Sequence, residues 1–393
     1  MSTYRYLIAG GGLTADGACK GIRDVDPDGP IGVVGAEAHP PYLRPPLSKD
    51  LWKGGPEDKI WRGTTDLGVE LHLSRTVVSL DLSKHEATDG EGETYTYERL
   101  LLATGGTPRR LPFGGDDVIY YRTLDDYRRL RTFADSHARA VVIGGGFIGS
   151  EVAAALAMND CPVTIVFPDP GVCSRIFPAD LSAFVTDYYR EKGVEVLAGG
   201  SVTGIERDDD HIHVSTGQGH MLEADVVVAG LGIQPNSDLA ASAGLPVDDG
   251  IPVDEFGRVD GHGDVFAAGD VARFPEAGLD RPVRVEHEDH AKSHGRAVGR
   301  NMAGANTPYD RMPFFYSDLF DLGYEAVGDL DSRQETFAEW KTPNRKGLVY
   351  YLDGERRPRG VLLWNLFDHV DDARELILAR EPIDRRSLAG LIG

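Results

Sequence analysis

The feature that most constrains the fold is a glycine-rich motif that occurs twice in the 393-residue chain. Each copy begins with a short run of strand-forming residues, passes through a glycine turn and continues into small, helix-forming residues. The first copy lies in residues 4–18 and the second in residues 138–157. The two motifs are Gly10-x-Gly12-x-x-Ala15 and Gly144-x-Gly146-x-x-Gly149.

This motif is typical of a strand–turn–helix unit that binds a dinucleotide. Its first glycine permits the tight turn from strand to helix, and its second lets the backbone approach a pyrophosphate. A small residue at the third position lets the helix pack closely on the strand. The N–H groups and partial positive charge of the helix N-terminus then face the phosphates. A glycine turn without a ligand is the alternative for either copy alone, so the repeat and its context carry the prediction.

A carboxylate follows the second predicted strand of each unit. Residues 31–35 are followed by Glu37, and residues 163–167 are followed by Asp169. A carboxylate at this position binds the ribose hydroxyls of a dinucleotide and repels a 2′-phosphate. Asp169 therefore favours NADH over NADPH, although Arg175 lies near enough in sequence to leave NADPH open. Two dinucleotide sites in one chain indicate FAD and a nicotinamide cofactor, because hydride passes readily between them.

The charge balance argues against two classes of partner. The chain has 63 acidic and 41 basic residues and a formal net charge of −22. A nucleic-acid binder needs a basic face, and docking on anionic lipid needs basic segments. We therefore expect neither nucleic acid nor a membrane as a partner. The sequence also has no run of about 18 apolar residues, so no transmembrane helix is expected, and no signal peptide is predicted.

The three cysteines, Cys19, Cys161 and Cys173, form no C-x-x-C or C-x4-C pair. A disulfide framework, an iron–sulfur site and a structural zinc site are therefore not predicted, and the reducing cytoplasm is the expected compartment. His290 and His294 stand one helical turn apart, a spacing that suits a metal. Because no third ligand is evident, we predict no metal site and interpret both histidines as surface residues.

Further segments resemble one superfamily. The run LLLATGG at residues 100–106 looks like the linker strand of two-dinucleotide flavoproteins, and DVFAAGD at residues 264–270 resembles their second FAD motif. With the two glycine motifs, these segments resemble the FAD-dependent pyridine nucleotide-disulfide oxidoreductases over residues 1 to about 300. In that family the Asp of the second motif meets the ribityl–phosphate region of the flavin. The resemblance implies FAD contacts from Thr104, Gly105, Gly269 and Asp270.

The segment after the first carboxylate indicates the branch of the superfamily. Disulfide reductases carry a redox cysteine pair there, and related NADH oxidases and peroxidases carry one cysteine, whereas this chain has PYLRPPLSK. RPPLSK resembles the oxygenase-coupled ferredoxin reductases and the apoptosis-inducing factor branch. Similar segments continue to the tail, namely RVEHEDH at residues 284–290, FYSDL at 315–319, GYEA at 323–326 and GVLLWN at 360–365.

Two departures limit what the resemblance implies. Tyr316 stands where the branch has a tryptophan, so it is kept as a cofactor contact without an assigned stacking role. Residues 331–346 are short where the mitochondrial member carries a long insertion. Apoptotic signalling and a redox switch based on that insertion are therefore not implied.

The resemblance also implies the residues that carry hydride transfer. Lys49 would lie beside the flavin, where a cation favours the reduced, anionic form, and would pair with Glu151, which would also contact the nicotinamide amide. His287 would lie beside the ring at the start of a helix over residues 286–301, whose N-terminus stabilises negative charge. The alternatives are a solvated surface lysine at Lys49 and, at Glu151 and Glu286, acids that only complement a helix dipole.

The predicted contacts divide between the two cofactors. The FAD contacts are Gly10, Gly12, Ala15, Glu37, Arg44 at the pyrophosphate, Lys49, Thr104, Gly105, Gly269, Asp270, Glu286, His287 and Tyr316. The NAD contacts are Gly144, Gly146, Ile148, Gly149, Glu151, Asp169 and Gly232. The candidate catalytic residues are Lys49, Glu151 and His287.

We expect an α/β fold with two Rossmann-like dinucleotide-binding domains and a small α+β C-terminal domain. The FAD-binding domain is predicted to comprise residues 1–114 and 242–308. The NAD(H)-binding domain, residues 115–241, is inserted between these two parts. Residues 309–393 are predicted to form the C-terminal interface domain.

Two functions fit these features. The first is an FAD-dependent NADH oxidoreductase that passes electrons to a ferredoxin-like carrier, and arginines within residues 109–110 and 128–131 would give an acidic carrier a basic patch. The second is a redox-responsive protein like apoptosis-inducing factor, which forms a long-lived FADH2–NAD charge-transfer complex, turns over slowly and changes its dimer state. The electron acceptor stays open, as does the oligomeric state, a homodimer included.

Overall fold

The structure is a computed structural model that describes residues 2–276, 278–384, 390 and 392. The chain divides into two compact units. Unit 1 contains residues 1–43, 58–107 and 234–313, and unit 2 contains residues 44–57, 108–233 and 314–393. Strands β7 (Gly106–Pro108) and β16 (Ile233–Pro235) lie at two of the points where the chain passes from one unit to the other. The division into three domains stays a prediction.

Unit 1 is built on an eight-stranded sheet whose central strands are parallel. Its main path is β18–β19–β6–β1–β2–β3, and β5 and then β4 extend it from β6. The strands are β1 (Ser2–Ala9), β2 (Ile31–Val34), β3 (Glu70–His72), β4 (Val77–Asp81), β5 (Glu86–Asp89), β6 (Thr94–Leu102), β18 (Arg258–Val259) and β19 (His262–Ala267). β1 pairs in parallel with both β2 and β6, as in a doubly wound nucleotide-binding fold.

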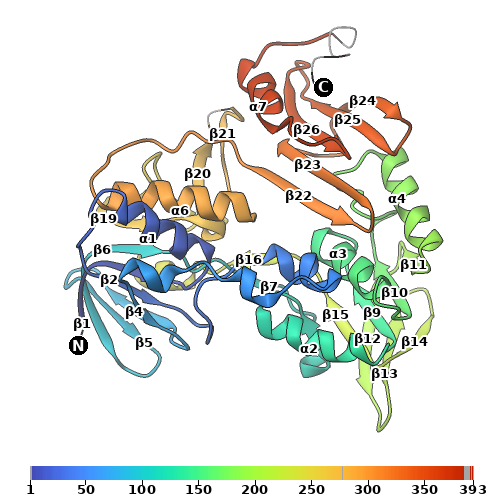
Figure 1. Ribbon diagram of the computed structural model, residues 1–393, viewed down its shortest axis with the longest axis horizontal. Coiled ribbons are helices and arrows are strands. Elements are labelled where there is room, and N and C mark those ends of the chain that lie inside the picture. Colours follow the sequence, from blue (N-terminus) through green and yellow to red (C-terminus); the bar gives the residue numbers. More distant parts are fainter. Residues whose placement is uncertain (1, 277, 385–389, 391, 393) are drawn as a thin grey trace. The chain divides into compact units, whose positions relative to one another are not determined.

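The helices of unit 1 are α1 (Leu13–Arg23), α5 (Asp238–Ser242) and α6 (Glu288–Met302). Helices α1 and α6 lie side by side over the sheet (Figure 1). Glycines spaced four residues apart let their backbones meet, because a Cβ on Gly21 would lie 2.0 Å from the Arg296 carbonyl oxygen. A Cβ on Gly299 would likewise lie 2.2 Å from the Ala18 carbonyl oxygen. The sheet and both helices enclose a buried apolar core.

A second, three-stranded sheet of unit 1 has the order β17–β20–β21. Its strands are β17 (Ile251–Pro252), β20 (Ala272–Glu276) and β21 (Arg281–Val283). Between β19 and β20 the chain makes a short 3-10 turn, η6 (Gly269–Val271).

Unit 2 contains a second parallel sheet, with five strands in the order β11–β10–β9–β15–β8. The strands are β8 (Val118–Tyr120), β9 (Ala140–Ile143), β10 (Val163–Phe167), β11 (Glu195–Ala198) and β15 (Val226–Ala229). The helices in this part of unit 2 are α2 (Leu124–Asp135), α3 (Phe147–Ala157) and α4 (Ala179–Glu191). A three-stranded antiparallel sheet consists of β12 (Val202–Arg207), β13 (Ile212–Thr216) and β14 (Met221–Ala224).

The C-terminal part of unit 2 is an antiparallel sheet with the order β22–β23–β26–β25–β24. The strands are β22 (Phe314–Leu319), β23 (Leu322–Gly328), β24 (Glu335–Thr342), β25 (Lys346–Leu352) and β26 (Pro358–Trp364). Helix α7 (Val370–Ala379) packs against β23 and β26. Two Rossmann-like sheets, each with parallel central strands, and this α+β part confirm the fold class predicted from the sequence.

Candidate nucleotide-binding and redox site

The first glycine turn (residues 10–15) joins β1 to α1 in unit 1. Gly10 has a φ of 121°, and a Cβ on it would lie 2.1 Å from the Ala103 carbonyl oxygen, so only glycine fits there. Gly12 is the N-cap of α1, and a Cβ on it would meet no atom within 4 Å. Ala15 is fully buried. The turn therefore leaves open space beside a helix N-terminus.

The second glycine turn (residues 144–149) joins β9 to α3 in unit 2 and has the same geometry. Gly144 has a φ of 113°, and a Cβ on it would lie 2.3 Å from the Gly230 carbonyl oxygen. Gly146 is the N-cap of α3, and a Cβ there would meet no atom within 4 Å. A Cβ on Gly149 would lie 1.9 Å from the Gly144 carbonyl oxygen, so this glycine lets helix and strand pack closely.

Neither α1 nor α3 has a side-chain cap at its N-terminus. Helix α2, in contrast, begins with a capping box in which the side chains of Thr123 and Asp126 each bond to the other residue's backbone N–H. Uncapped amides beside open space are the arrangement that binds a pyrophosphate. Both glycine turns therefore fit a dinucleotide.

The LLLATGG segment contains the end of β6 and continues beyond it, at the edge of the unit 1 sheet where the first glycine turn follows β1. Leu102, the last residue of β6, pairs with Ala9 of β1 and with Ala267 of β19, so the carboxyl ends of three parallel strands meet there. Thr104 and Gly105 follow directly. Thr104 and Gly105, two of the predicted FAD contacts, therefore lie close to the first glycine turn and to the second FAD motif within unit 1.

Asn236 fixes this segment and was missed by the sequence reasoning. Its side-chain amide donates to the Thr104 carbonyl at 2.9 Å, and the Thr104 hydroxyl donates to the Asn236 carbonyl at 2.7 Å. The backbone N–H of Asn236 donates to the Gly105 carbonyl at 2.9 Å. Thr104 and Asn236 are 132 positions apart in the sequence, so no local pattern in the sequence indicates these contacts.

The second FAD motif ends in η6, where Gly269 has a φ of 72°. A Cβ on Gly269 would lie 2.1 Å from the hydroxyl oxygen of Thr14, which belongs to the first turn of α1. The turn that carries Asp270 therefore packs directly on the helix of the first glycine turn. Glu37, three residues beyond β2, accepts a hydrogen bond from the Tyr42 hydroxyl at 2.5 Å.

At the start of α6, Glu286 and His287 both have partners within unit 1. His287 is the N-cap, and its Nδ1 accepts the backbone N–H of Asp289 at 3.4 Å. Glu286 pairs with Arg284 at 2.6 Å. The predicted helix start at residue 286 lies two residues before the observed one at Glu288. The contact of Glu286 and His287 with FAD stays a prediction.

In unit 2, Lys49 and Glu151 form a buried ion pair. The Lys49 Nζ lies 2.6 Å from the Glu151 Oε1, and the two side chains are 8% and 4% exposed. The alternative of a solvated surface lysine is therefore wrong. A buried charge pair requires further hydrogen bonds to offset the loss of hydration.

Two serines supply those hydrogen bonds. The Ser317 hydroxyl donates to Oε1 of Glu151 and the Ser48 hydroxyl donates to its Oε2, each at 2.5 Å. The Lys49 Nζ also lies 5.5 Å from the centre of the Tyr316 ring, within range of a cation–π contact. Because the serines stand 166 and 103 residues from Glu151, the sequence reasoning missed both.

The loop before Lys49 is anchored in unit 2 by its own neighbours. The Trp52 indole N–H donates to the Leu47 carbonyl at 2.6 Å, and the Tyr121 hydroxyl donates to the same oxygen. Arg44 donates from Nη1 to the Arg122 carbonyl at 2.8 Å. Its predicted role at the FAD pyrophosphate stays a prediction.

The predicted NAD residues lie in the second glycine turn and the start of α3, just after β10 and just after β15. Asp169 is partly exposed, and its carboxylate lies 3.3 Å from Nε of Arg175, which is 80% exposed. Ile148 is an exposed apolar residue in the first turn of α3. Gly232 has a φ of 78°, and its carbonyl accepts the backbone N–H of Arg109 at 2.9 Å.

The interpretation of His290 and His294 as surface residues is wrong. Their exposed fractions are 0% and 1%. Both lie on the face of α6 that also buries Ala291, Gly295 and Val298, so the small and apolar residues around the histidines mark a buried stripe. Within the described residues, no group of three or more His, Cys, Asp or Glu side chains is arranged to hold a metal.

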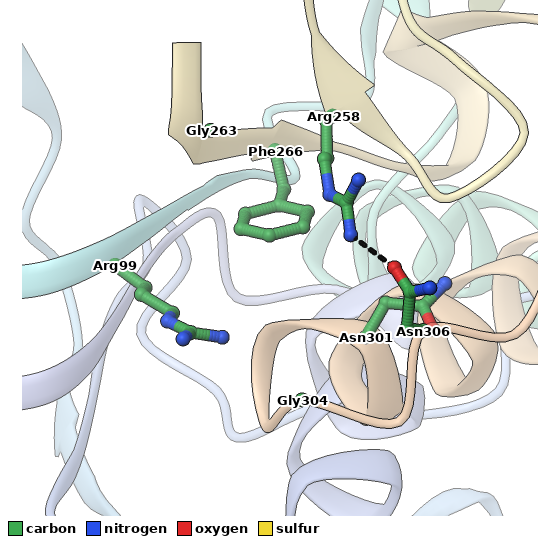
Figure 2. A pocket seen from close by; sticks show the side chains of 7 residues that line it. All are labelled: Arg99, Arg258, Gly263, Phe266, Asn301, Gly304 and Asn306. Carbon is green, nitrogen blue, oxygen red and sulfur yellow. Dashed lines mark hydrogen bonds between the residues drawn. The ribbon is translucent and has the colours of Figure 1, made fainter.

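A pocket of about 300 Å³ opens at the C-terminal end of α6 (Figure 2). It is lined by Arg99, Arg258, Gly263, Phe266, Asn301, Gly304 and Asn306. Arg99 donates to the carbonyl of Met302, the last residue of α6, and Arg258 donates to Asn306 at 2.5 Å. Cations are stabilising at a helix C-terminus, so Arg99 stabilises the end of α6. None of the predicted cofactor contacts lines this pocket.

All three cysteines are buried and unpaired. Burial raises the pKa of Cys19 and of Cys173 to about 12, and it also raises the pKa of Cys161. Such thiols are poor nucleophiles. Among the helices that the structure describes, none has the length and apolar character to cross a membrane.

Comparison with known families decides the assignment. Residues 4–295 match the model of the family described as pyridine nucleotide-disulphide oxidoreductase. The chain belongs to this family. Residues 298–345 match the model described as apoptosis-inducing factor, mitochondrion-associated, C-term. The resemblance to the apoptosis-inducing factor branch of the pyridine nucleotide-disulphide oxidoreductases is therefore confirmed.

Members of the family are similar to this chain over nearly its whole length. "Apoptosis-inducing factor 1, mitochondrial" of Dictyostelium discoideum is 32% identical, over 98% of this chain and 80% of its own length. "Anthranilate 1,2-dioxygenase system ferredoxin--NAD(+) reductase component" of Burkholderia cepacia is 32% identical, over 99% of this chain and 98% of its own. The reductase in the crystal structure of the covalent putidaredoxin reductase–putidaredoxin complex has a TM-score of 0.91 and 30% identity, covering 99% of this chain and 96% of that one.

As a pyridine nucleotide-disulphide oxidoreductase, the protein is an FAD-dependent NAD(P)H oxidoreductase of the ferredoxin-reductase-like kind. Its cofactors are FAD and a nicotinamide dinucleotide, as the sequence predicted. The two glycine turns, one in each unit, fit these two dinucleotides. The roles of individual residues are untested by these comparisons and stay predictions.

Proposed function

We propose that this protein oxidises NADH in preference to NADPH and passes the electrons to a ferredoxin-like carrier. The observation that carries the NADH preference is the Asp169 carboxylate, which follows β10 beside the second glycine turn. A carboxylate there accepts ribose hydroxyls and repels a 2′-phosphate. The exposed Arg175 is already paired with this carboxylate at 3.3 Å, which reduces its use for a phosphate.

The buried cysteines support the transfer of electrons from the flavin to a carrier rather than to a disulfide. Burial raises the pKa of Cys19, Cys161 and Cys173 and keeps all three as thiols at neutral pH, so none of them is poised to attack a disulfide substrate. FAD, when bound, supplies the chemistry that accepts a hydride and releases electrons singly. A ferredoxin-like acceptor is also what the names of two well-covered relatives imply.

Within unit 2, we propose that Lys49 and Glu151 contact the reacting rings. The Lys49 ammonium provides a fixed positive charge that favours an anionic reduced flavin. Glu151 holds that ammonium at 2.6 Å and is itself held by Ser48 and Ser317. These contacts hold the Lys49 ammonium in place before any ligand binds, so its charge is preorganised.

The NADH preference is tested by anaerobic reduction of the FAD-loaded protein with NADH or NADPH. We expect faster reduction by NADH at equal concentration. Asp169→Asn removes the charge that repels a 2′-phosphate and should lower the NADH/NADPH ratio of kcat/KM by about tenfold. Asp209→Asn, at an exposed site on the β12–β13 connection, is the matched control and should leave the ratio unchanged. A wild-type preference for NADPH contradicts the proposal.

A second candidate is favoured by the match of residues 298–345 to the apoptosis-inducing factor C-terminal model. It is a redox-responsive protein that stays reduced in air and changes its oligomeric state. Reduction with NADH, followed by reoxidation with air or with an added [2Fe–2S] ferredoxin, separates the two. Rapid oxidation by the ferredoxin supports the reductase. Persistence of the reduced protein with both acceptors, together with a change in size-exclusion volume, supports the second candidate.

A further inference from the structure

Helix α6 carries two buried histidines that the proposed function does not use. His290 and His294 lie one turn apart in a buried aromatic cluster with Phe274 and Tyr309. The His290 ring stacks on Phe274 with centroids 4.7 Å apart and planes inclined by 16°. The His294 ring lies 4.7 Å from Tyr309. Rings packed on several sides in this way have little freedom to turn.

His294 contacts the turn that carries Asp270. The backbone N–H of Gly269 donates to Nδ1 of His294 at 3.3 Å, and the bond is buried. An imidazole that accepts at Nδ1 carries its proton on Nε2 and is neutral. Burial, together with the neighbouring His290, lowers the pKa of His294 well below its usual value, which agrees with a neutral ring.

The other side of Gly269 leaves little room. Its α-carbon faces Thr14, where a Cβ would lie 2.1 Å from the hydroxyl oxygen. Gly295, the residue after His294, is equally close to α1, because a Cβ there would lie 2.4 Å from the Thr14 carbonyl oxygen. The turn is therefore enclosed by α1 on one side and by His294 on the other.

Gly269 needs such a constraint. With a φ of 72° it lies in a region where glycine has wide conformational freedom. If His294 could not accept, the Gly269 N–H would be buried without a partner, and rotation of the peptide group would relieve that cost. The same rotation would turn the backbone of Asp270, the next residue.

We infer that His294 is a positioning residue for FAD: by accepting the Gly269 N–H, it fixes the turn that directs Asp270 at the ribityl–phosphate part of the cofactor. The inference rests on the proposed assignment of Gly269 and Asp270 to FAD. It assigns His294 no contact with the cofactor itself.

The test compares the affinity of the protein for FAD with its affinity for ADP, which lacks the ribityl–flavin half. His294→Leu removes the acceptor at similar volume and should raise the Kd for FAD by about tenfold or more. The Kd for ADP should change by less than about twofold, since ADP uses the first glycine turn.

His294→Asn places an amide oxygen near the position of Nδ1 and should restore FAD binding to within about threefold of wild type. Ser293→Ala, which loses a contact only with Tyr309 among the described ones, is the matched control and should bind both ligands normally.

Equal loss of FAD and ADP affinity in His294→Leu would indicate a general structural role and overturn the inference, as would unchanged FAD affinity. If that variant does not fold, 15N spectra of histidine-labelled wild-type holoprotein decide instead. They should show His294 as the neutral Nε2–H tautomer, and the Nδ1–H tautomer would overturn the inference. Wild-type protein that binds no FAD would contradict the proposed FAD assignment and is thereby distinguished from failure of the inference.

Discussion

At the scale of single residues, the Glu151 carboxylate shows how a charge is held inside this fold. One oxygen accepts from Lys49 and Ser317 and the other from Ser48. Removing one member of such a group leaves the others buried without a hydrogen-bonding or charged partner. The free-energy cost of that is larger than the net contribution of the lost bond. The four side chains are therefore expected to respond to substitution as a unit.

Lys49→Met tests this group. It keeps the length of the side chain but leaves the Glu151 carboxylate without its cation, so we expect the free energy of unfolding to fall by about 3–5 kcal/mol. Reduction of the flavin by NADH should slow by at least about tenfold. Urea unfolding and stopped-flow absorbance measure the two effects. Lys84→Met, which breaks an exposed pair with Asp81 at 2.7 Å, is the control and should change neither, and a Lys49→Met enzyme of normal rate would contradict the role.

The buried His290 gives a prediction for pH. Burial lowers its pKa from 6.5 to about 3, and the nearby His287 acts in the same direction. Between these two values the unfolded chain binds a proton that the folded chain does not. Stability attributable to His290 is therefore complete above pH 6.5 and declines as the pH falls, by about 1.4 kcal/mol per unit.

His290→Phe removes this titration and retains a ring that can stack on Phe274. The variant should lose less stability than wild type between pH 6.5 and 4, by about 1.4 kcal/mol per unit. Above pH 7.5 the difference in the free energy of unfolding between the two proteins should no longer change with pH. Urea unfolding at a series of pH values measures it. Parallel curves for the two proteins across the acid range would show that His290 is not the neutral buried group described.

At the scale of elements, the parts predictable from sequence are those fixed by local geometry. The first glycine turn, the strand β10 at residues 163–167 and the second glycine turn appear where they were expected, because glycine positions and strand periodicity act within a few residues. Ser317 and Asn236 were not predictable, since their roles depend on contacts more than 100 residues away. The buried face of α6 is indicated by the small residues Ala291 and Gly295 beside the two histidines, and not by the polar histidines themselves.

The packing of α1 on α6 predicts an unusual effect of alanine in a helix. Alanine ordinarily stabilises a helix by about 1 kcal/mol relative to glycine. At Gly21, however, its Cβ would lie 2.0 Å from the Arg296 carbonyl oxygen, a backbone atom that cannot turn aside. Gly21→Ala should therefore lower the free energy of unfolding by about 2 kcal/mol or more.

Gly354→Ala is the control for this substitution, because a Cβ there meets no atom within 4 Å. It should leave the free energy of unfolding unchanged or slightly higher. Urea unfolding of both variants gives the comparison. Stabilisation by Gly21→Ala would mean that the two helices are farther apart than described.

At the scale of the whole molecule, two nucleotide-binding units are joined in a chain of net charge −22. The arginines predicted to form a basic patch have local partners: Arg128 pairs with Glu57, and Arg131 pairs with Asp135. Arg110 lies over the Tyr120 ring. These contacts reduce the positive charge available to an acidic carrier. The two glycine turns, one in each unit, are the features on which the two dinucleotide sites depend.

Gly12→Ala and Gly146→Ala, compared in FAD content and in reduction by NADH, test most directly whether the turns hold different dinucleotides. Both variants should fold normally, since a Cβ at either position meets no protein atom within 4 Å. Gly12→Ala should be purified without flavin. Gly146→Ala should retain FAD but need at least about tenfold more NADH for half-maximal reduction. Normal FAD content in Gly12→Ala would show that the two turns do not hold different dinucleotides, and so would either loss of FAD or an unchanged NADH requirement in Gly146→Ala.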